Sequence, residues 1–302
     1  MSAPTLSKAL YPKVRRIVFP FGQPVPMDKY FVDGNIPLSH LIAQMSFVFP
    51  PGEEAFIRSV RRYSHLITDP GLKKRVAGFI GQEAVHGLQH RDLNDKLVEM
   101  GYRGWELSEN LGKKNEEREN RMDAQWPPAQ YPEKYRLARF AMLAATATAE
   151  HGTAVLAERL LSLPEAQALM TDPEVKNLLN WHAFEELEHK SVAFDVYRAV
   201  DGPEWLRVAI ARVTAATIVP VLVIGSLISI LGCDRGALRR PIKIAKDVVQ
   251  VFKHPIMKGL RKDMKLAGRR GFHPDDIDTT PLLDKWNAEL FGDNGALLDH
   301  LK

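Results

Sequence analysis

The sequence predicts an all-α protein built around a four-helix bundle. Between residues 53 and 200, apolar residues recur at helical spacing, and the alternation typical of strands is scarce. Proline-containing breaks divide this region into long segments, as expected where helices end. The chain has 302 residues, of which 45% are hydrophobic and 26% are charged. This composition is typical of a globular protein with a large core and excludes a wholly disordered chain.

The N-terminal residues 1–52 are expected to form an extended arm with one short helix. Eight of the twenty prolines lie within the first 51 residues, and proline fixes φ and lacks the backbone N–H that regular structure needs. Apolar spacing predicts a short amphipathic helix over residues 39–49. The first sixteen residues contain no apolar run of signal-peptide length, so we expect a cytoplasmic protein.

Residues 53–204 are expected to form the bundle. Proline, glycine or a polar link bounds each of its helices. The expected helices cover residues 53–67, 72–100, 132–163 and 174–200. A polar, charged connection at residues 108–130 separates the first pair from the second. This order of hairpin, long crossover and hairpin is the connectivity of a ferritin-like four-helix bundle.

Residues 205–302 combine an apolar stretch with a basic one. Residues 213–233 contain no charged side chain, and residues 234–270 contain 12 Lys and Arg against 3 Asp and Glu. That local charge of +9 leaves −5 for the rest of the chain, whose net charge is +4. The tail is expected to pack back on the bundle through Trp286 and Phe291.

Several placements of residues 213–270 are open. An apolar helix of this length spans about 30 Å, enough to cross a hydrocarbon core. The basic segment would then bind an anionic membrane surface at the inner face of the membrane. The apolar helix could insert at the interface, span the membrane, or be buried against the bundle or in a homodimer. A nucleic acid is not expected as a partner, because aromatic side chains are not interleaved with the basic ones.

Two Glu-x-x-His pairs carry the strongest functional signal. Glu83 and His86 lie on the second expected helix, and Glu186 and His189 repeat the spacing on the fourth. Residues three apart share a helix face, so each pair can act at one site. Glu150 is the only acid in the apolar run of the third helix. The acids and histidines therefore mark one face on each of three helices.

The first helix opens with Glu53 and Glu54. In antiparallel hairpins, residues equally far from the turn lie at the same height. Glu53, Glu150 and the two Glu-x-x-His pairs each lie roughly 20 Å from their turns at the helical rise, so they are expected to meet in one layer. Four carboxylates and two imidazoles suit two Fe ions, with Mn or Zn as alternatives. The single cysteine, Cys233, excludes a cysteine cage.

Other histidines and acids are expected around this layer. His90 and His182 lie on the same faces as the pairs, one or two turns away. That position suits an outer hydrogen-bonding role, an alternative ligand or a core histidine bonded to a carbonyl. His151 is rotated by about 100° from the acid before it, so it is expected further out. Glu185 and Glu188 are expected to face solvent or to pair with Lys or Arg.

The segments that carry these residues resemble a bacterial family described as predicted metal-dependent hydrolases. They read SFVFPPGEEAFIRSVRRY, FIGQEAVHGLQH, TATAEH and WHAFEELEHKSVAFDVY. The likeness covers most of residues 35–200, and GFHPDD at residues 271–276 also fits. The resemblance implies six metal ligands, which are Glu53, Glu83, His86, Glu150, Glu186 and His189. Glu53 is chosen from the family's Gly-Glu pair, with Glu54 as its rival.

The donor set is also similar to that of ferritin-like di-iron oxidases and oxygenases. We therefore expect an O2-dependent oxidation or hydroxylation of a hydrophobic small molecule, with no catalytic residue beyond the ligands. Phe79, Thr146 and Phe184 are expected to line the substrate pocket. Small residues at 144–149 would either make room for the substrate or only let helices approach. The alternatives are a hydrolase with a metal-activated water, as the family description implies, and a non-catalytic iron-binding protein.

Overall fold

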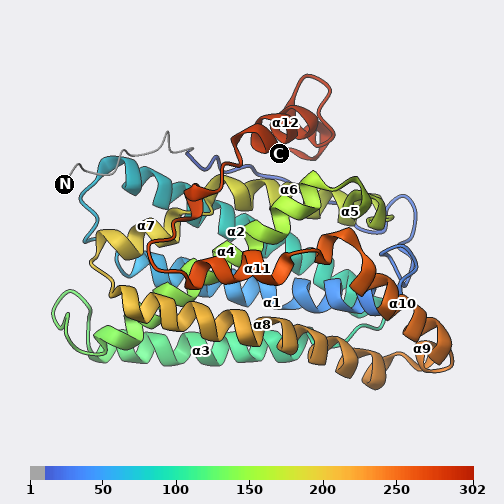
Figure 1. Ribbon diagram of the computed structural model, residues 1–302, viewed down its shortest axis with the longest axis horizontal. Coiled ribbons are helices and arrows are strands. Elements are labelled where there is room, and N and C mark those ends of the chain that lie inside the picture. The colour runs from blue at the N-terminus through green and yellow to red at the C-terminus, as the bar shows by residue number, and fades with distance from the viewer. Residues whose placement is uncertain (1–10) are drawn as a thin grey trace.

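The computed structural model describes residues 11–302, and in this part of the chain it is helical, with two isolated β-bridges and no strand (Figure 1). The predicted all-α bundle is confirmed. Two predictions concern the first ten residues, which are outside the described part of the chain. They are the expected lack of a signal peptide and the beginning of the extended arm. Residues 11–35 are non-helical, in agreement with the extended arm.

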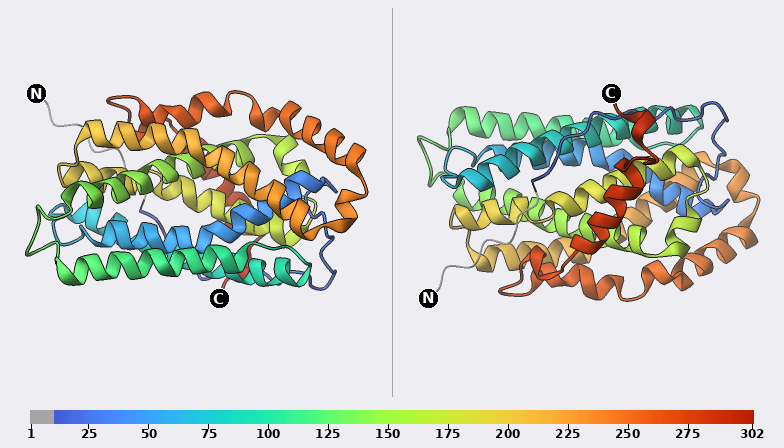
Figure 2. Two further views of the ribbon diagram at one scale, coloured as in Figure 1. Left: turned by 90° about the horizontal axis from the view of Figure 1, so that it is seen from below. Right: turned by 90° about the horizontal axis from the view of Figure 1, so that it is seen from above.

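Four long helices form the bundle, and they pack as two hairpins (Figure 2). The first hairpin is α1, Ile36–Arg61, with α2, Pro70–Glu99, and the second is α4, Arg136–Ser162, with α6, Pro173–His189. The start of three of these helices is set by a side chain that accepts hydrogen bonds from backbone N–H groups of the first turn. These capping residues are Asn35, Asp69 and Asp172.

α1 continues through Pro50 and Pro51, where the sequence predicted a boundary. The expected short helix at 39–49 and the separate helix from residue 53 were therefore wrong as two elements. Pro50 cannot donate to the carbonyl of Ser46, but Asn94 Nδ2 of α2 donates to that carbonyl at 3.1 Å. The tertiary contact replaces the missing helical hydrogen bond. Glu53 consequently lies inside a continuous helix and not at a fraying end.

The polar connection predicted at 108–130 is largely a helix, α3, Trp105–Gln125. It lies along α1, and its acids form ion pairs with that helix. Arg62 of α1 contacts Glu119 at 3.0 Å and Asp123 at 2.7 Å. α3 has no broad apolar stripe, so hydrophobic spacing does not reveal it. Its position is instead set by these charges.

The fourth bundle helix is shorter than predicted. α6 ends at His189, and α7, Val192–Ala199, begins after a break. Arg75 of α2 stabilises the break by contacting Ser191 Oγ at 2.7 Å and Asp195 at 2.6 Å. The predicted link between residues 164 and 173 contains a short helix, α5, Pro164–Leu169.

The apolar stretch lies within α8, Glu204–Cys233, which runs along α4 and α1 (Figure 1). Among the described residues, α8 is long and apolar enough to cross a membrane by length and composition, and 18% of its most apolar stretch is buried. The helices that follow are α9, Arg235–Leu238; α10, Pro241–Lys253; α11, Leu260–Met264; and α12, Thr280–Phe291. The tail packs back as predicted, because Trp286 is buried and donates to the carbonyl of Leu161 at 2.9 Å.

Two apolar clusters fill the interior of the bundle. The same helices also bury a layer of acids and histidines. One cluster surrounds Trp181 and Leu93, and the other surrounds Phe79 and Phe140. Both include side chains of α1, α2 and the second hairpin. The buried acids and histidines on these same helices are therefore enclosed by apolar packing on either side.

Replacing Asn94 by alanine should lower the free energy of unfolding by about 1–3 kcal/mol. The change leaves the Ser46 carbonyl without its donor in the protein interior. Urea unfolding of the metal-free chain followed by circular dichroism measures the effect. Asn110→Ala on the exposed side of α3 is the matched control and should change stability by less than about 0.5 kcal/mol. Equal effects of the two substitutions would contradict the role assigned to Asn94.

Candidate metal centre

The structure brings the six expected ligands into one buried layer. α1 and α4 each supply one acid, and α2 and α6 each supply a Glu-x-x-His pair. None of the six is more than 4% exposed. They are Glu53, Glu83, His86, Glu150, Glu186 and His189. The rival Glu54 is exposed and contacts Arg91 at 2.5 Å, so it does not face the layer.

One half of the layer is centred on His189. Its Nε2 atom lies 3.0 Å from Glu83 Oε1, 3.2 Å from Glu150 Oε2 and 3.5 Å from Glu186 Oε2. The contact with Glu83 lacks hydrogen-bond geometry. It is a close approach of two atoms that could both coordinate a metal. Glu83, Glu150 and His189 offer ligand atoms within 4.8 Å of one another, which is close enough to share one ion.

The other half contains His86, His182 and Glu53. His182 Nε2 lies 2.8 Å from Glu186 Oε1 and 3.8 Å from Glu53 Oε1. His86 Nδ1 lies 3.9 Å from Glu83 Oε1 and 4.0 Å from Glu186 Oε1. Glu83 and Glu186 thus contact both halves. These two carboxylates therefore connect the two halves of the layer.

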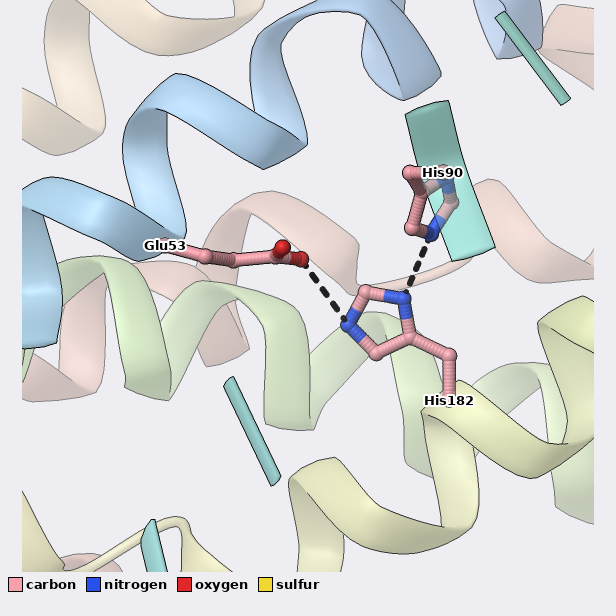
Figure 3. A group of neighbouring side chains, drawn as sticks. All are labelled: Glu53, His90 and His182. Carbon is pink, nitrogen blue, oxygen red and sulfur yellow. Dashed lines mark hydrogen bonds and ion pairs between the residues drawn. The ribbon is translucent and has the colours of Figure 1, made fainter. Parts of the chain in front are cut away.

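A hydrogen-bond chain determines which nitrogen of His182 faces the layer. Asn94 donates to the Ser46 carbonyl, so its Oδ1 accepts from the Ser46 hydroxyl at 2.6 Å. Ser46 Oγ then accepts from His90 Nδ1 at 2.9 Å, and His90 Nε2 accepts from His182 Nδ1 at 2.8 Å. His182 lies between Glu53 and His90, with one ring nitrogen toward each (Figure 3). The inner nitrogen of His182 therefore keeps a lone pair directed at the carboxylates.

This chain distinguishes two histidines for which the sequence left alternatives open. His182 is in the position of an additional ligand, because its inner nitrogen faces the acids and lies 2.8 Å from Glu186 Oε1. His90 is in the outer position, because both of its nitrogens are already paired. Burial, and then the nearby His182, lower the pKa of His90 well below its ordinary value, which keeps this ring neutral.

The two predicted ligand histidines, His86 and His189, are also oriented by hydrogen bonds at their outer nitrogens. His86 Nε2 contacts Glu185 Oε2 at 3.1 Å, and His189 Nδ1 contacts Gln82 Oε1 at 2.9 Å. Both partners are acceptors, so each outer nitrogen carries the proton. The inner nitrogen of each ring is left as a potential metal donor, as is usual for ligand histidines.

Glu185 is fully buried, and the expectation that it would face solvent was wrong. Its carboxylate contacts Arg15 at 2.9 Å, and the same guanidinium contacts Glu188 at 2.8 Å, so the alternative of pairing with an arginine is confirmed. Burial raises the pKa of Glu185 to about 7, although Arg15 acts in the opposite direction. Arg15 belongs to the N-terminal arm, 170 residues away from Glu185. Helical spacing could identify neither this partner nor Gln82.

Three of the four acids of the layer lack hydrogen-bond partners among the described residues. Both carboxylate oxygens of Glu53, Glu83 and Glu150 are buried without a donor. The inner nitrogens of His86 and His189 are equally unpaired. Unpaired carboxylates in a protein interior are costly. A cation bound between these atoms would supply the missing partner, so the donor set fits a metal centre.

The charges of the layer shift several pKa values strongly. Burial, and then the neighbouring glutamates, raise the pKa of Glu53 and of Glu150 well above the ordinary value. Burial acts on Glu186 in the same direction, but the close contacts with the His182 and His189 rings outweigh it and hold its pKa well below the ordinary value. Burial lowers the pKa of His189, but the acids around it, Glu150 first, raise it well above its ordinary value.

Aromatic rings and one glycine shape the surroundings. Phe79 lies 5.1 Å from the His189 ring, Trp181 lies 4.9 Å from His86, and Phe49 lies 4.9 Å from His182. Phe49 and Trp181 were not predicted. Gly87 leaves room for Glu53, since a Cβ there would lie 3.2 Å from Glu53 Oε2. The metal layer is therefore polar at its centre and aromatic at its edges.

The other predicted pocket residues lie elsewhere. Phe184 contacts Arg15 and Phe291, on the side of α6 that faces the arm and the tail. Thr146 lies 2.8 Å from Ser59 Oγ of α1, which agrees with small residues letting helices approach. His151 donates to the carbonyl of Asp263 at 2.9 Å, so it is held by the C-terminal segment.

A family model described as predicted metal-dependent hydrolase matches residues 13–278. The chain belongs to this family. The match includes the arm residue Arg15 and the whole buried layer, and the expected family membership is confirmed. The description of the family agrees with the metal-binding donor groups but names a hydrolase, so it gives no support to the expected preference for an oxidoreductase. Searches of curated proteins and of solved structures gave no significant match.

Metal loading should release protons at neutral pH. Glu53, Glu150 and His189 have raised pKa values without a metal, so protons compete with the ion and the apparent affinity should increase with pH. Calorimetric titration with Mn(II) in two buffers of different ionisation heat measures the number of protons released. Glu54→Gln, outside the layer, should behave as the unmodified chain, and Glu150→Gln should release fewer protons. Metal binding with no proton release in either buffer would contradict the assignment.

Proposed function

We propose that the chain is a dinuclear metal enzyme that uses O2 to oxidise a hydrophobic small molecule. The observation that carries this proposal is the convergence of unpaired, buried donors on two adjacent positions. Four carboxylates carry the charge that balances two divalent ions, and the imidazoles are oriented by outer hydrogen bonds. In such a site a metal cation would take the place of the protons that the buried acids otherwise hold.

We assign seven ligands to the two ions. Three would hold the first ion, two would hold the second, and two acids would bridge the pair. The first group is Glu53, His86 and His182; the second is Glu150 and His189; the bridging acids are Glu83 and Glu186. This oxygen-rich set with three imidazoles suits iron or manganese better than metals that prefer thiolates.

Two reduced iron ions in such a site would supply the electrons for activating O2. The chain's own contribution is to hold the ligands and to exclude competing water. Phe79, Trp181 and Phe49 flank three of the imidazoles and form an apolar boundary around the ions. This boundary supports an apolar substrate.

The family description favours a second candidate, metal-dependent hydrolysis. The same ligands could hold two Zn or Mn ions that lower the pKa of a bound water and polarise an ester or phosphoester. Both candidates use the same site and differ in the second reactant, which is O2 in one and water in the other. The two functions are therefore separable by assay.

Iron reconstitution tests the proposal directly. The full chain loaded with Fe(II) under anaerobic conditions should bind about two ions per chain, as expected for a dinuclear carboxylate site, and should consume O2 on exposure to air. Glu83→Ala removes a bridging acid and should reduce both metal content and O2 uptake, whereas Glu54→Ala should leave both unchanged. Elemental analysis and an oxygen electrode provide the measurements, and circular dichroism verifies folding.

Each other outcome points to a different function. Iron-loaded protein that consumes no O2, together with ester or phosphoester turnover by the Zn or Mn form, would establish the hydrolase. Iron loaded far in excess of two ions per chain would indicate iron handling without catalysis. A chain that binds no metal would remove both enzymatic functions.

Glu185→Gln should weaken metal binding by about 10–100-fold, because Glu185 holds the outer nitrogen of His86. Glu54→Gln is the control, since Glu54 is exposed and pairs with Arg91 outside the layer. Competition with a chelator measures the affinity, and thermal melting of the metal-free variants reports their stability. If Glu185→Gln binds metal as tightly as Glu54→Gln, the orientation of His86 by Glu185 has no part in metal binding.

A further inference from the structure

The outer face of α8 is apolar along most of its length. Val213, Val221, Ile224, Ile228 and Leu231 are between 54% and 66% exposed. At about 100° per residue, they lie within an arc of roughly 80° on one side of the helix. An apolar patch of this kind on a protein surface marks an interaction site.

The inner face of α8 carries small and polar side chains along much of its length, with Val208 and Ile230 buried near its two ends. Ala211, Ser226 and Ser229 are buried, and Ser229 Oγ lies 2.9 Å from His40 Nδ1 of α1. A surface helix in water shows the opposite polarity, with its apolar stripe toward the core. Helices that contact lipid place small and polar residues against neighbouring helices and large aliphatic residues outward. The polarity of α8 therefore favours an apolar environment on its outer side.

α10 carries a second apolar stripe, which faces away from α1. Ile242, Val249 and Phe252 are at least 50% exposed and share one side of the helix. Asp247 lies on the opposite side, where its carboxylate accepts a hydrogen bond from the Ile36 backbone N–H at 2.9 Å. This bond ties the inner side of α10 to the start of α1. The stripe is left on the outside of the molecule.

Basic side chains accompany both stripes. Lys246 and Lys253 lie beside the α10 stripe by helical spacing, and Arg235, Arg239 and Arg240 lie where α8 is joined to α10. All five are exposed. Long basic side chains can place their charge at lipid phosphates while their methylene groups stay among apolar residues.

We propose that the α8–α10 surface, which consists of these two stripes and five basic residues, binds the surface of an anionic lipid membrane. The aliphatic side chains enter the boundary between headgroups and acyl chains, and the lysines and arginines contact lipid phosphates. The inner faces of both helices contact α1, so the chain binds as a peripheral protein with α8 still packed on the bundle.

Charge favours a membrane over a second copy of the chain. A symmetric dimer through this surface would place two copies of the same patch against each other. Residues 234–270 carry 12 Lys and Arg against 3 Asp and Glu, so such a dimer would bring like charges together. An anionic membrane covers the apolar side chains and neutralises the basic ones at the same time.

Vesicle sedimentation with the full chain tests this proposal. We expect binding to phosphatidylcholine vesicles that contain phosphatidylglycerol, and binding weaker by about tenfold or more without it or at high salt. The paired change Ile224→Gln with Ile228→Gln should reduce binding by about tenfold or more. Leu107→Gln with Leu111→Gln on α3 is the matched control, because these leucines are 65% and 58% exposed outside the surface.

The basic residues have their own variant pair. Lys246→Gln with Lys253→Gln should reduce binding to the anionic vesicles, while Lys113→Gln with Lys114→Gln on α3 should not. Circular dichroism and metal content, which none of these exposed positions should change, verify that each variant is folded. No binding by the unmodified chain, or equal losses in the α3 controls, would overturn the proposal. The proposal would also be overturned if light scattering showed a dimer of the unmodified chain that dissociates when Ile224 and Ile228 are both replaced by glutamine.

Discussion

The cost of burying four glutamates in one layer is the constraint on which the rest of the structure depends. An ionised carboxylate without a partner loses several kcal/mol when it leaves water. Glu53, Glu83 and Glu150 have no hydrogen-bond donor among the described residues. Without a metal, protons and the His189 ring carry the compensating charge, which explains the raised pKa values in the layer. A bound metal would supply this charge instead.

The surrounding structure keeps these donors from relaxing toward solvent. Asn94 restores the hydrogen bond that Pro50 removes, so α1 holds Glu53 within a continuous helix. The same Asn94 begins the hydrogen-bond chain that ends at His182. Arg15 covers the opposite side by binding the carboxylate that orients His86. Asn94 thus supports both the backbone of α1 and the orientation of the His182 ring.

Local spacing in the sequence was enough to predict the bundle and the convergence of Glu150 with the two Glu-x-x-His pairs, whereas the choice of Glu53 over Glu54 came from the resemblance to the family. Glu83–His86 and Glu186–His189 each share a helix face, and their distance from the turns sets a common height. Spacing could not predict the continuous α1, because the compensating Asn94 lies on another helix. It could not predict Glu185 as a buried partner either, since Arg15 comes from the arm. Contacts between elements carry no periodic signal within either element.

The apolar boundary of the site bears on the choice between oxidation and hydrolysis. Hydrolysis requires water as the second reactant at the metal, whereas oxidation requires O2 and a substrate that can be apolar. Phe79 and Trp181 are buried beside the imidazoles, while Phe49 is half-buried against His182 and His90. Three of the imidazoles are therefore flanked by aromatic rings. Polar solutes would lose their hydration beside these rings, whereas O2 and apolar compounds would lose little, and our proposal of oxidation rests on this difference.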